Sequence, residues 1–120
     1  MSAELVSAAN GIVTAKISGK LTHPELAALQ KAASAYIDKH GDVSFLVLTE
    51  NFQGWEKAGD WADVSFSAKH DPFIKKIAIV GDKKWEDLAL LFTAQGIRRV
   101  PIEYFQTADL ARARAWVAAP

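Results

Sequence analysis

The spacing of hydrophobic residues near the N-terminus has a period of two, which is typical of a strand with one buried face. Apolar and polar residues alternate over residues 12–18. The dipeptide Asn10-Gly11 precedes this run, and a type I′ turn needs positive φ at both of its central residues. The pattern therefore predicts a β-hairpin that joins Leu5 and Val6 to the strand at 12–18. The side chains expected to face the core are Val13, Ala15 and Ile17.

The spacing then changes to that of a helix. Thr22 and Glu25, three residues apart, have the sequence pattern of a capping box, and Pro24 lies in the first turn, where its missing N–H costs nothing. Gly41 is the residue type that most often ends a helix. The apolar residues of this predicted helix repeat at helical spacing: Leu26, Leu29, Ala33, Tyr36 and Ile37.

Strand-like and helix-like segments alternate over the rest of the chain. The predicted elements are a buried strand at 43–49, a helix at 56–71, a strand at 73–80, a helix at 83–95, a strand at 98–105 and a last helix. Pro72 ends the second helix, Gly96 closes the third, and Pro101 places the last strand at an edge or a bulge. Thr107 is expected to cap the last helix. The apolar side of that helix consists of Leu110, Ala113 and Val117.

The element order is therefore ββαβαβαβα, which predicts an α/β fold. Strands separated by helices of about 12 or more residues imply right-handed crossovers, so the sheet is expected to be mixed, mostly parallel and covered by helices. The hairpin adds one antiparallel strand. No linker or low-complexity tract interrupts the sequence, so residues 1–120 are expected to form a single domain.

Charge and composition argue against several classes of function. The 14 Lys and Arg residues balance the 14 Asp and Glu residues, whereas a nucleic-acid-binding surface normally shows a basic excess. The absence of cysteine removes disulfides, thiolate chemistry and cysteine metal sites. His23, His40 and His70 lie in separate segments, so neither a metal site nor a cofactor is predicted. No apolar run approaches the ~18 residues of a membrane span, and the N-terminus lacks a signal-peptide pattern, so a cytoplasmic location is expected.

The segment after the most apolar strand carries the candidate binding residues. In an open α/β sheet, the loop that leaves the carboxyl end of a central strand is where ligands usually bind. Residues 50–55 are expected to form this loop, and they include no Ser, Cys, His or Lys that is placed as a nucleophile. The segment is therefore interpreted as a recognition surface rather than a reaction centre. The candidate ligand- or partner-binding residues are Glu50, Phe52, Trp55, Ala58, Trp61, Ala62, Phe66 and Trp85.

The second predicted helix is more apolar than its place on a sheet requires. Its apolar residues cover an arc of about 200°, and covering a sheet takes ~100° or slightly more. Three explanations stay open: Trp55 and Trp61 pack in the core, the helix forms a dimer contact, or it covers an apolar pocket. For Trp85 the alternatives are core packing and a pocket wall. Glu50 either orients a polar group of a ligand or caps backbone N–H groups of the loop.

Several segments of the chain resemble the SpoIIAA-like branch of the STAS superfamily, which is sometimes grouped with Sec14-type lipid-binding domains. The resemblance covers essentially the whole chain. It rests on the opening hairpin, the segment 50–61, the run Lys76-Ile77-Ala78-Ile79-Val80-Gly81-Asp82-Lys83-Lys84-Trp85, and Tyr104-Phe105 with the short helix that follows. It implies a SpoIIAA-like fold with protein partners, regulatory switching or small-ligand sensing, and the Sec14 side implies an apolar ligand.

One functional motif of the superfamily has no counterpart in this sequence. Anti-sigma antagonists carry a phosphorylatable Ser or Thr at the N-terminus of the second helix. This chain has Asn51-Phe52-Gln53-Gly54-Trp55-Glu56 at that place, without a hydroxyl group. The phosphorylation switch therefore does not carry over.

Two hypotheses follow, and neither is an enzyme. The first is a non-catalytic regulatory module that contacts a partner protein or forms a homodimer through its aromatic second helix. The second is a carrier or sensor of a small apolar, lipid-like ligand, with the second helix as a lid over Phe52, Trp55, Trp61 and Trp85. Catalysis would need Glu50 or an Asp to act alone, because the sequence shows no nucleophile–base pair or metal set. Nucleic-acid binding is not expected, and peripheral membrane contact stays open.

Overall fold

The computed structural model describes residues 3–56, 69–93 and 98–119. Most of the predicted second helix lies outside these described residues, and so does the predicted helix end at Gly96. Of the candidate binding residues, Ala58, Trp61, Ala62 and Phe66 fall in that part of the chain.

The predicted hairpin is confirmed. Strands β1 (Ala3–Ala9) and β2 (Ile12–Leu21) pair antiparallel. Between them, Asn10 and Gly11 have φ angles of 57° and 76°, both positive as a type I′ turn requires. Along β2, Val13 and Ala15 are almost completely buried, and Ile17 is half-buried.

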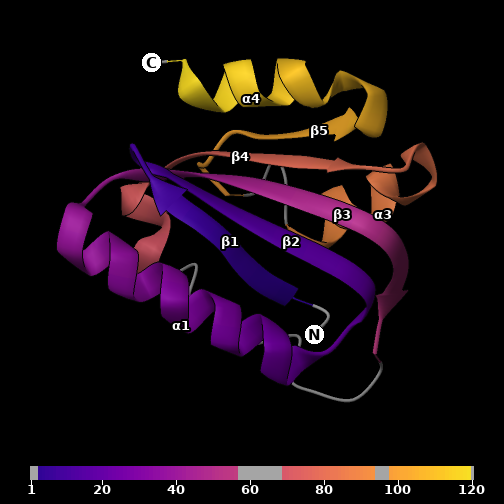
Figure 1. The fold of residues 1–120 in the computed structure, drawn as a ribbon, viewed down its shortest axis with the longest axis horizontal. Coiled ribbons are helices and arrows are strands. Elements are labelled where there is room, and N and C mark those ends of the chain that lie inside the picture. The colour runs from indigo at the N-terminus through magenta and orange to yellow at the C-terminus, as the bar shows by residue number, and fades with distance from the viewer. Residues whose placement is uncertain (1–2, 57–68, 94–97, 120) are drawn as a thin grey trace.

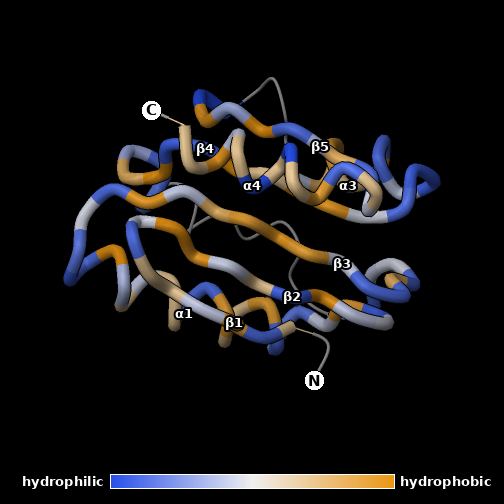
Figure 2. Tube along the Cα trace, turned by 45° about the horizontal axis from the view of Figure 1, so that its top comes forward, coloured by the Kyte–Doolittle hydropathy of each residue, from blue (hydrophilic) through white to orange (hydrophobic). Residues whose placement is uncertain are grey.

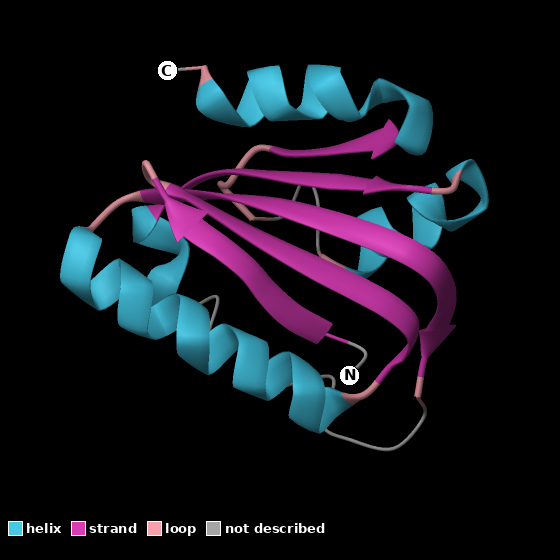
Figure 3. Ribbon diagram, viewed as in Figure 1, coloured by secondary structure: helices cyan, strands magenta, loops and turns pink. Residues whose placement is uncertain are grey.

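The five strands form one sheet in the order β1-β2-β3-β4-β5 (Figure 1). Strands β3 (Val43–Trp55), β4 (Ile74–Gly81) and β5 (Ile102–Gln106) run parallel to β2 and to one another. Figure 3 shows the resulting arrangement of a mostly parallel sheet with helices on both sides. The α/β fold with one antiparallel edge strand is therefore as the sequence predicts.

Strand β3 is longer than predicted, and this changes the place of the candidate residues. It continues past Thr49 to Trp55, so residues 50–55 belong to a strand and the prediction of a loop was wrong. The extension pairs with the end of β2, where Gly19 is opposite Phe52 and Leu21 is opposite Trp55. Two register shifts accompany this pairing, because the backbone of the extension turns at residues with positive φ. These residues are Asn51 (φ 51°) and Gly54 (φ 98°).

The first helix, α1 (His23–His40), has the predicted ends. The Thr22 hydroxyl oxygen accepts a hydrogen bond from the backbone N–H of Glu25 (3.3 Å), which is the expected N-cap. Gly41 follows the helix with φ 86°, and its N–H bonds to the carbonyl of Ile37 (2.7 Å). Two apolar residues of the predicted stripe, Ala33 and Ile37, are buried.

The segment that leads into β4 differs from its predicted boundary. Residues 69 and 70 are helical, and a short 3₁₀ helix, η1 (Asp71–Phe73), follows them. Strand β4 therefore begins at Ile74, one residue later than expected. Glu56, where the second helix was expected to begin, continues the strand direction, and its N–H bonds to the carbonyl of Leu21 (2.8 Å).

The elements of the C-terminal part are shorter than predicted. The third helix starts as the 3₁₀ turn η2 (Lys83–Trp85) and becomes α3 (Glu86–Phe92). Strand β5 begins at Ile102 rather than at residue 98, because Pro101 has no N–H for a ladder. Thr107 does not cap the last helix, since it lies in the 3₁₀ turn η3 (Thr107–Asp109) ahead of α4 (Leu110–Ala118).

The two faces of the sheet bury different sets of residues. On one face, α4 packs on the central strands through Ala113 and Val117 (Figure 1). On the other face, α1 packs on β1 and β2, and α3 lies near β4 and β5. Side chains alternate along β3, so Leu46 faces α4 whereas Phe45 faces α1 and α3. Figure 2 shows that the middle of β3 is hydrophobic. Its side chains pack in the cores on both faces of the sheet.

The N-cap of α1 gives a prediction for stability. Replacing Thr22→Ala leaves the N–H of Glu25 without its partner, so the free energy of unfolding falls by about 1 kcal/mol. Urea denaturation measures this loss. The matched control is Thr22→Ser, which keeps the hydroxyl oxygen and is expected to leave the free energy of unfolding unchanged, because serine is at least as good an N-cap as threonine. Equal losses in both variants would contradict a role for the hydroxyl.

Candidate functional site

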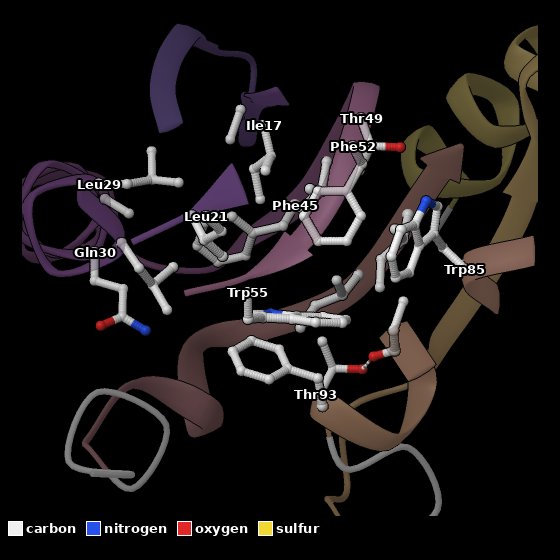
Figure 4. A pocket seen from close by; sticks show the side chains of 18 of the residues that line it. Ile17, Leu21, Leu29, Gln30, Phe45, Thr49, Phe52, Trp55, Trp85 and Thr93 are labelled. Atoms are coloured by element: carbon white, nitrogen blue, oxygen red, sulfur yellow. Dashed lines mark hydrogen bonds between the residues drawn. The ribbon is translucent and has the colours of Figure 1, made fainter. Parts of the chain in front are cut away.

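A cavity of about 270 Å³ lies between α1, the sheet and α3. Figure 4 shows side chains from all three layers that point into it. Most of its described wall is aliphatic, and includes Ile17, Leu21, Leu29, Phe45, Val47 and Ile79. Folded interiors contain few voids larger than a water molecule, whose share of liquid volume is ~30 Å³. The cavity is thus much larger than a packing defect.

Four aromatic rings form one side of the cavity. Phe52 and Trp55 come from the end of β3, Trp85 from the end of η2 and Phe92 from the end of α3. The Phe52 ring lies edge-on to both tryptophans, with centroid distances of 5.0 Å to each. The Trp55 ring lies 6.1 Å from Trp85 and 5.0 Å from Phe92. These separations and the edge-on orientations are those of favourable aromatic pairs.

Local backbone geometry fixes the two tryptophans against each other. The Asp82 side chain accepts a hydrogen bond from the N–H of Lys84 (3.0 Å), which holds the turn that presents Trp85. Gly54 lies against the same ring, and a Cβ atom at Gly54 would be 3.4 Å from it. With φ at 98°, this position favours glycine for its backbone as well.

Two hydroxyl groups of the wall meet at Gly81. Thr49 Oγ1 donates to the carbonyl of Val80 (2.8 Å), and Tyr104 Oη donates to the carbonyl of Asp82 (2.6 Å). A Cβ atom at Gly81 would overlap Thr49 Oγ1 and lie 2.7 Å from Tyr104 Oη. Burial raises the pKa of Tyr104 to about 12, and the negative charges of Asp82 and Glu86 add to this effect. The phenol is therefore neutral at physiological pH.

The arginine of the wall is already paired. Arg98 Nε and Nη2 bond to the two carboxylate oxygens of Asp71 at 2.9 Å and 2.5 Å, and Nη1 bonds to the carbonyl of Thr93 (3.3 Å). This is the bidentate geometry in which guanidinium and carboxylate match best. The pair links the segment before β4 to the segment before β5.

The structure brings three of the candidate residues together. Phe52, Trp55 and Trp85 contact one another in the cavity wall. Glu50 is outside the described wall, and its carboxylate pairs with Lys16 Nζ at 2.8 Å. Its hydrogen bond raises the pKa of Lys16, but both side chains are exposed, so the pair contributes little to stability.

Sequence reasoning missed other parts of the wall. Phe92 lies seven residues after Trp85, which is two helical turns, and this spacing already indicated a shared face. Tyr104 and Thr49 had no such signal, because their approach depends on the neighbouring strands β4 and β5 and on the missing side chain of Gly81.

Two donors of the cavity wall are unpaired. Of the buried polar side-chain atoms in residues 3–56, 69–93 and 98–119, the indole Nε1 atoms of Trp55 and Trp85 have no hydrogen-bond partner. Such a group costs about 1–3 kcal/mol when it is left unpaired. In the same residues, no three His, Cys, Asp or Glu side chains gather as metal ligands. No helix in that part of the chain is long and apolar enough to cross a membrane.

Two comparisons with known proteins point to a SpoIIAA-like fold. A family model described as SpoIIAA-like matches residues 12–118. The fold is similar to that of an uncharacterized DUF3478-family protein with a SpoIIAA-like fold from Shewanella loihica PV-4, with a TM-score of 0.71. The two chains are 19% identical, and the match covers 96% of this chain and 91% of the other. At this identity the likeness shows the fold alone. No protein with a curated description matches the chain.

The contact at Gly81 predicts a coupled pair of substitutions. Gly81→Ala is expected to lower the free energy of unfolding by about 1–3 kcal/mol, because the new methyl group overlaps the Thr49 hydroxyl. Adding Thr49→Ala removes that overlap, so the double variant loses less than the sum of the single losses. Denaturation of all four members of the cycle measures the difference. Simple additivity would contradict the contact.

The raised pKa of Tyr104 predicts a loss of stability in alkali. Because the folded pKa of about 12 exceeds the ordinary tyrosine pKa of 10.0, its contribution is complete below about pH 10 and disappears as the pH rises toward about 12. In Tyr104→Phe this part of the decline is absent. Unfolding curves across that pH range compare the two proteins, and the ultraviolet signal of tyrosinate follows the titration. Parallel declines would contradict the assignment.

Proposed function

The chain belongs to the SpoIIAA-like family, and on this premise we propose that it is a non-catalytic module that binds a small apolar ligand in the cavity between α1, the sheet and α3. One observation carries the proposal: an aliphatic and aromatic cavity of about 270 Å³ lies between α1, the sheet and α3.

The size and lining of the cavity support a small ligand. Binding pockets for small molecules are typically ~300–1,000 Å³, mostly apolar, with a few polar groups that fix orientation. This cavity is at the lower end of that range, so a single ring with a short chain suits it better than a lipid with two long chains. The apolar ligand that the Sec14 side of the resemblance implies is therefore expected to be small.

Three polar side chains of the described wall, those of Thr49, Tyr104 and Arg98, favour binding over catalysis. Thr49 and Tyr104 donate their hydroxyl protons to backbone carbonyls, and Arg98 is held by Asp71. A nucleophile needs an adjacent base, and these groups are not arranged in that way. Glu50, the acid considered from the sequence, pairs with Lys16 outside the described wall.

A protein contact is the second candidate function. In α3, Leu88 and Leu91 expose 48% and 77% of their surface, and their spacing of three residues places them side by side on the helix. These two side chains suit a contact with a regulatory partner or a second copy of the chain. Homodimerisation through the aromatic second helix stays a prediction, because residues 57–68 lie outside the described residues. A cytoplasmic location is likewise proposed.

A substitution that fills part of the cavity tests the proposed function. Ala15 is 2% exposed and forms part of the cavity wall, so Ala15→Leu is expected to keep or raise the free energy of unfolding. Pentylbenzene, added as an apolar probe, is expected to raise the melting temperature of the wild-type protein but not of this variant. Native mass spectrometry on the purified wild-type protein tests for releasable cargo in parallel.

The matched control is Ala78→Leu on the opposite face of the sheet. Ala78 is completely buried against the α4 side, so the larger side chain costs about 1–3 kcal/mol there and leaves pentylbenzene binding intact. Should Ala15→Leu be destabilised as much as Ala78→Leu, with no probe bound by the wild type, the region is an ordinary core and the proposal fails.

A further inference from the structure

Trp55 and Trp85 in the cavity wall each have one polar group, the indole N–H, that makes no hydrogen bond within the described residues. An indole N–H is a donor only, and it cannot be satisfied by another donor. Both Nε1 atoms are buried and unpaired in the part of the chain that the structure describes. The ring centroids are 6.1 Å apart with an interplanar angle of 83°, so both rings are within the span of one small molecule. Figure 4 shows the two rings on the same side of the cavity.

The hydroxyl groups near the two tryptophans already donate hydrogen bonds to backbone carbonyls. Thr49, Thr93 and Tyr104 donate to the carbonyls of Val80, Ala89 and Asp82 at 2.8, 2.9 and 2.6 Å. Their oxygens keep lone pairs, and Tyr104 is protonated because burial raises its pKa to about 12. The donors that this aromatic side offers to a ligand are therefore the two indole groups.

Two positively charged side chains near the cavity, those of Arg98 and Lys84, are poorly placed to bind an anionic ligand. Both carboxylate oxygens of Asp71 already bind Arg98, so an anion beside this guanidinium would compete with a paired carboxylate. Lys84 Nζ lies 5.8 Å from the centre of the Trp85 ring, on an exposed side chain. A carboxylate moved into the aliphatic cavity would lose its hydration without gaining a free cation from these groups.

Building on the proposed function, we infer that the ligand is an uncharged molecule whose apolar body carries a hydrogen-bond acceptor, such as a ketone or ester carbonyl, and that an indole N–H group of Trp55 or Trp85 donates to it. The aliphatic wall holds the body, and the indoles select for the acceptor. A pure hydrocarbon leaves both donors unpaired, and a carboxylate pays for its desolvation.

Three probes with equal numbers of heavy atoms test the inference: butyrophenone as the ketone, pentylbenzene as the hydrocarbon and phenylpropanoate as the anion. The protein is labelled with ¹⁵N, and its four tryptophans give four indole N–H signals. The variants Trp55→Phe, Trp85→Phe and Trp116→Phe assign three of these signals. Butyrophenone is expected to shift the signal of Trp55 or of Trp85 downfield, because its carbonyl oxygen accepts a hydrogen bond from that indole N–H.

Affinities of the variants give the quantitative test. Trp→Phe keeps an aromatic ring and removes the N–H, so the substitution at the tryptophan whose signal shifts is expected to weaken butyrophenone binding about fivefold. Pentylbenzene affinity is expected to stay within about twofold of wild type. Trp116 packs against Phe105 on the α4 side of the sheet, and Trp116→Phe is therefore the control that changes neither affinity.

The outcomes separate this inference from the proposed function. Equal effects of the substitutions on butyrophenone and pentylbenzene, or unmoved indole signals, would overturn the inference while the cavity still binds. Tighter binding of phenylpropanoate than of butyrophenone would also overturn it, in favour of an anion site. If none of the three probes binds, the proposed function fails together with the inference.

Discussion

The pairing of the last part of β2 with the last part of β3 is the constraint on which the cavity depends. Leu21 is opposite Trp55, and the N–H of Glu56 bonds to the carbonyl of Leu21 at 2.8 Å. These contacts carry β3 past the point where its neighbour β4 ends its pairing, at Leu48 and Val80. Phe52 and Trp55 are consequently held on a strand, and strands position side chains more rigidly than loops do. Trp85 and Phe92 pack against that fixed pair.

The cavity also depends on two places where neighbouring side chains lie close to the backbone, and glycine occupies both. Gly54 lies against the Trp85 ring, and Gly81 lies against the hydroxyls of Thr49 and Tyr104. At Gly54 the positive φ and the ring contact act together, whereas at Gly81 the space alone excludes a Cβ atom. The aromatic side and the hydroxyl side of the cavity thus each depend on one glycine. Both glycines lie at the carboxyl ends of strands, where ligands of parallel sheets usually bind.

The sequence predicted the elements whose signals are local. The turn at Asn10-Gly11 and the cap at Thr22 follow from backbone geometry that a few neighbouring residues determine. The extension of β3 could not be found in this way, since residues 50–55 contain Asn51 and Gly54, which interrupt an alternating pattern. Only the presence of β2 beside them makes this irregular segment a strand, through bulges that absorb the extra residues.

The candidate site was predicted in part for the same reason. The composition of the segment after the central strand pointed to Phe52 and Trp55, whereas Phe92 was missed although it lies two helical turns after Trp85. Glu50 was grouped with them by sequence position. Side chains alternate along a strand, however, and its carboxylate reaches Lys16 rather than the described wall. The participation of Tyr104 required knowledge of which strands are neighbours.

The anchoring of α4 affects which parts of the sequence can change without disturbing the core. Lys76 Nζ bonds to the carbonyls of Trp116 and Ala119 at 2.8 Å and 3.1 Å, and it lies 5.0 Å from the centre of the Trp116 ring. This clamp holds the last helix to β4 on the face of the sheet opposite the cavity. Drift in the sequence of the cavity wall therefore leaves one complete half of the core in place. Substitutions on the side of the sheet that faces the cavity therefore leave the packing between α4 and the opposite side unchanged.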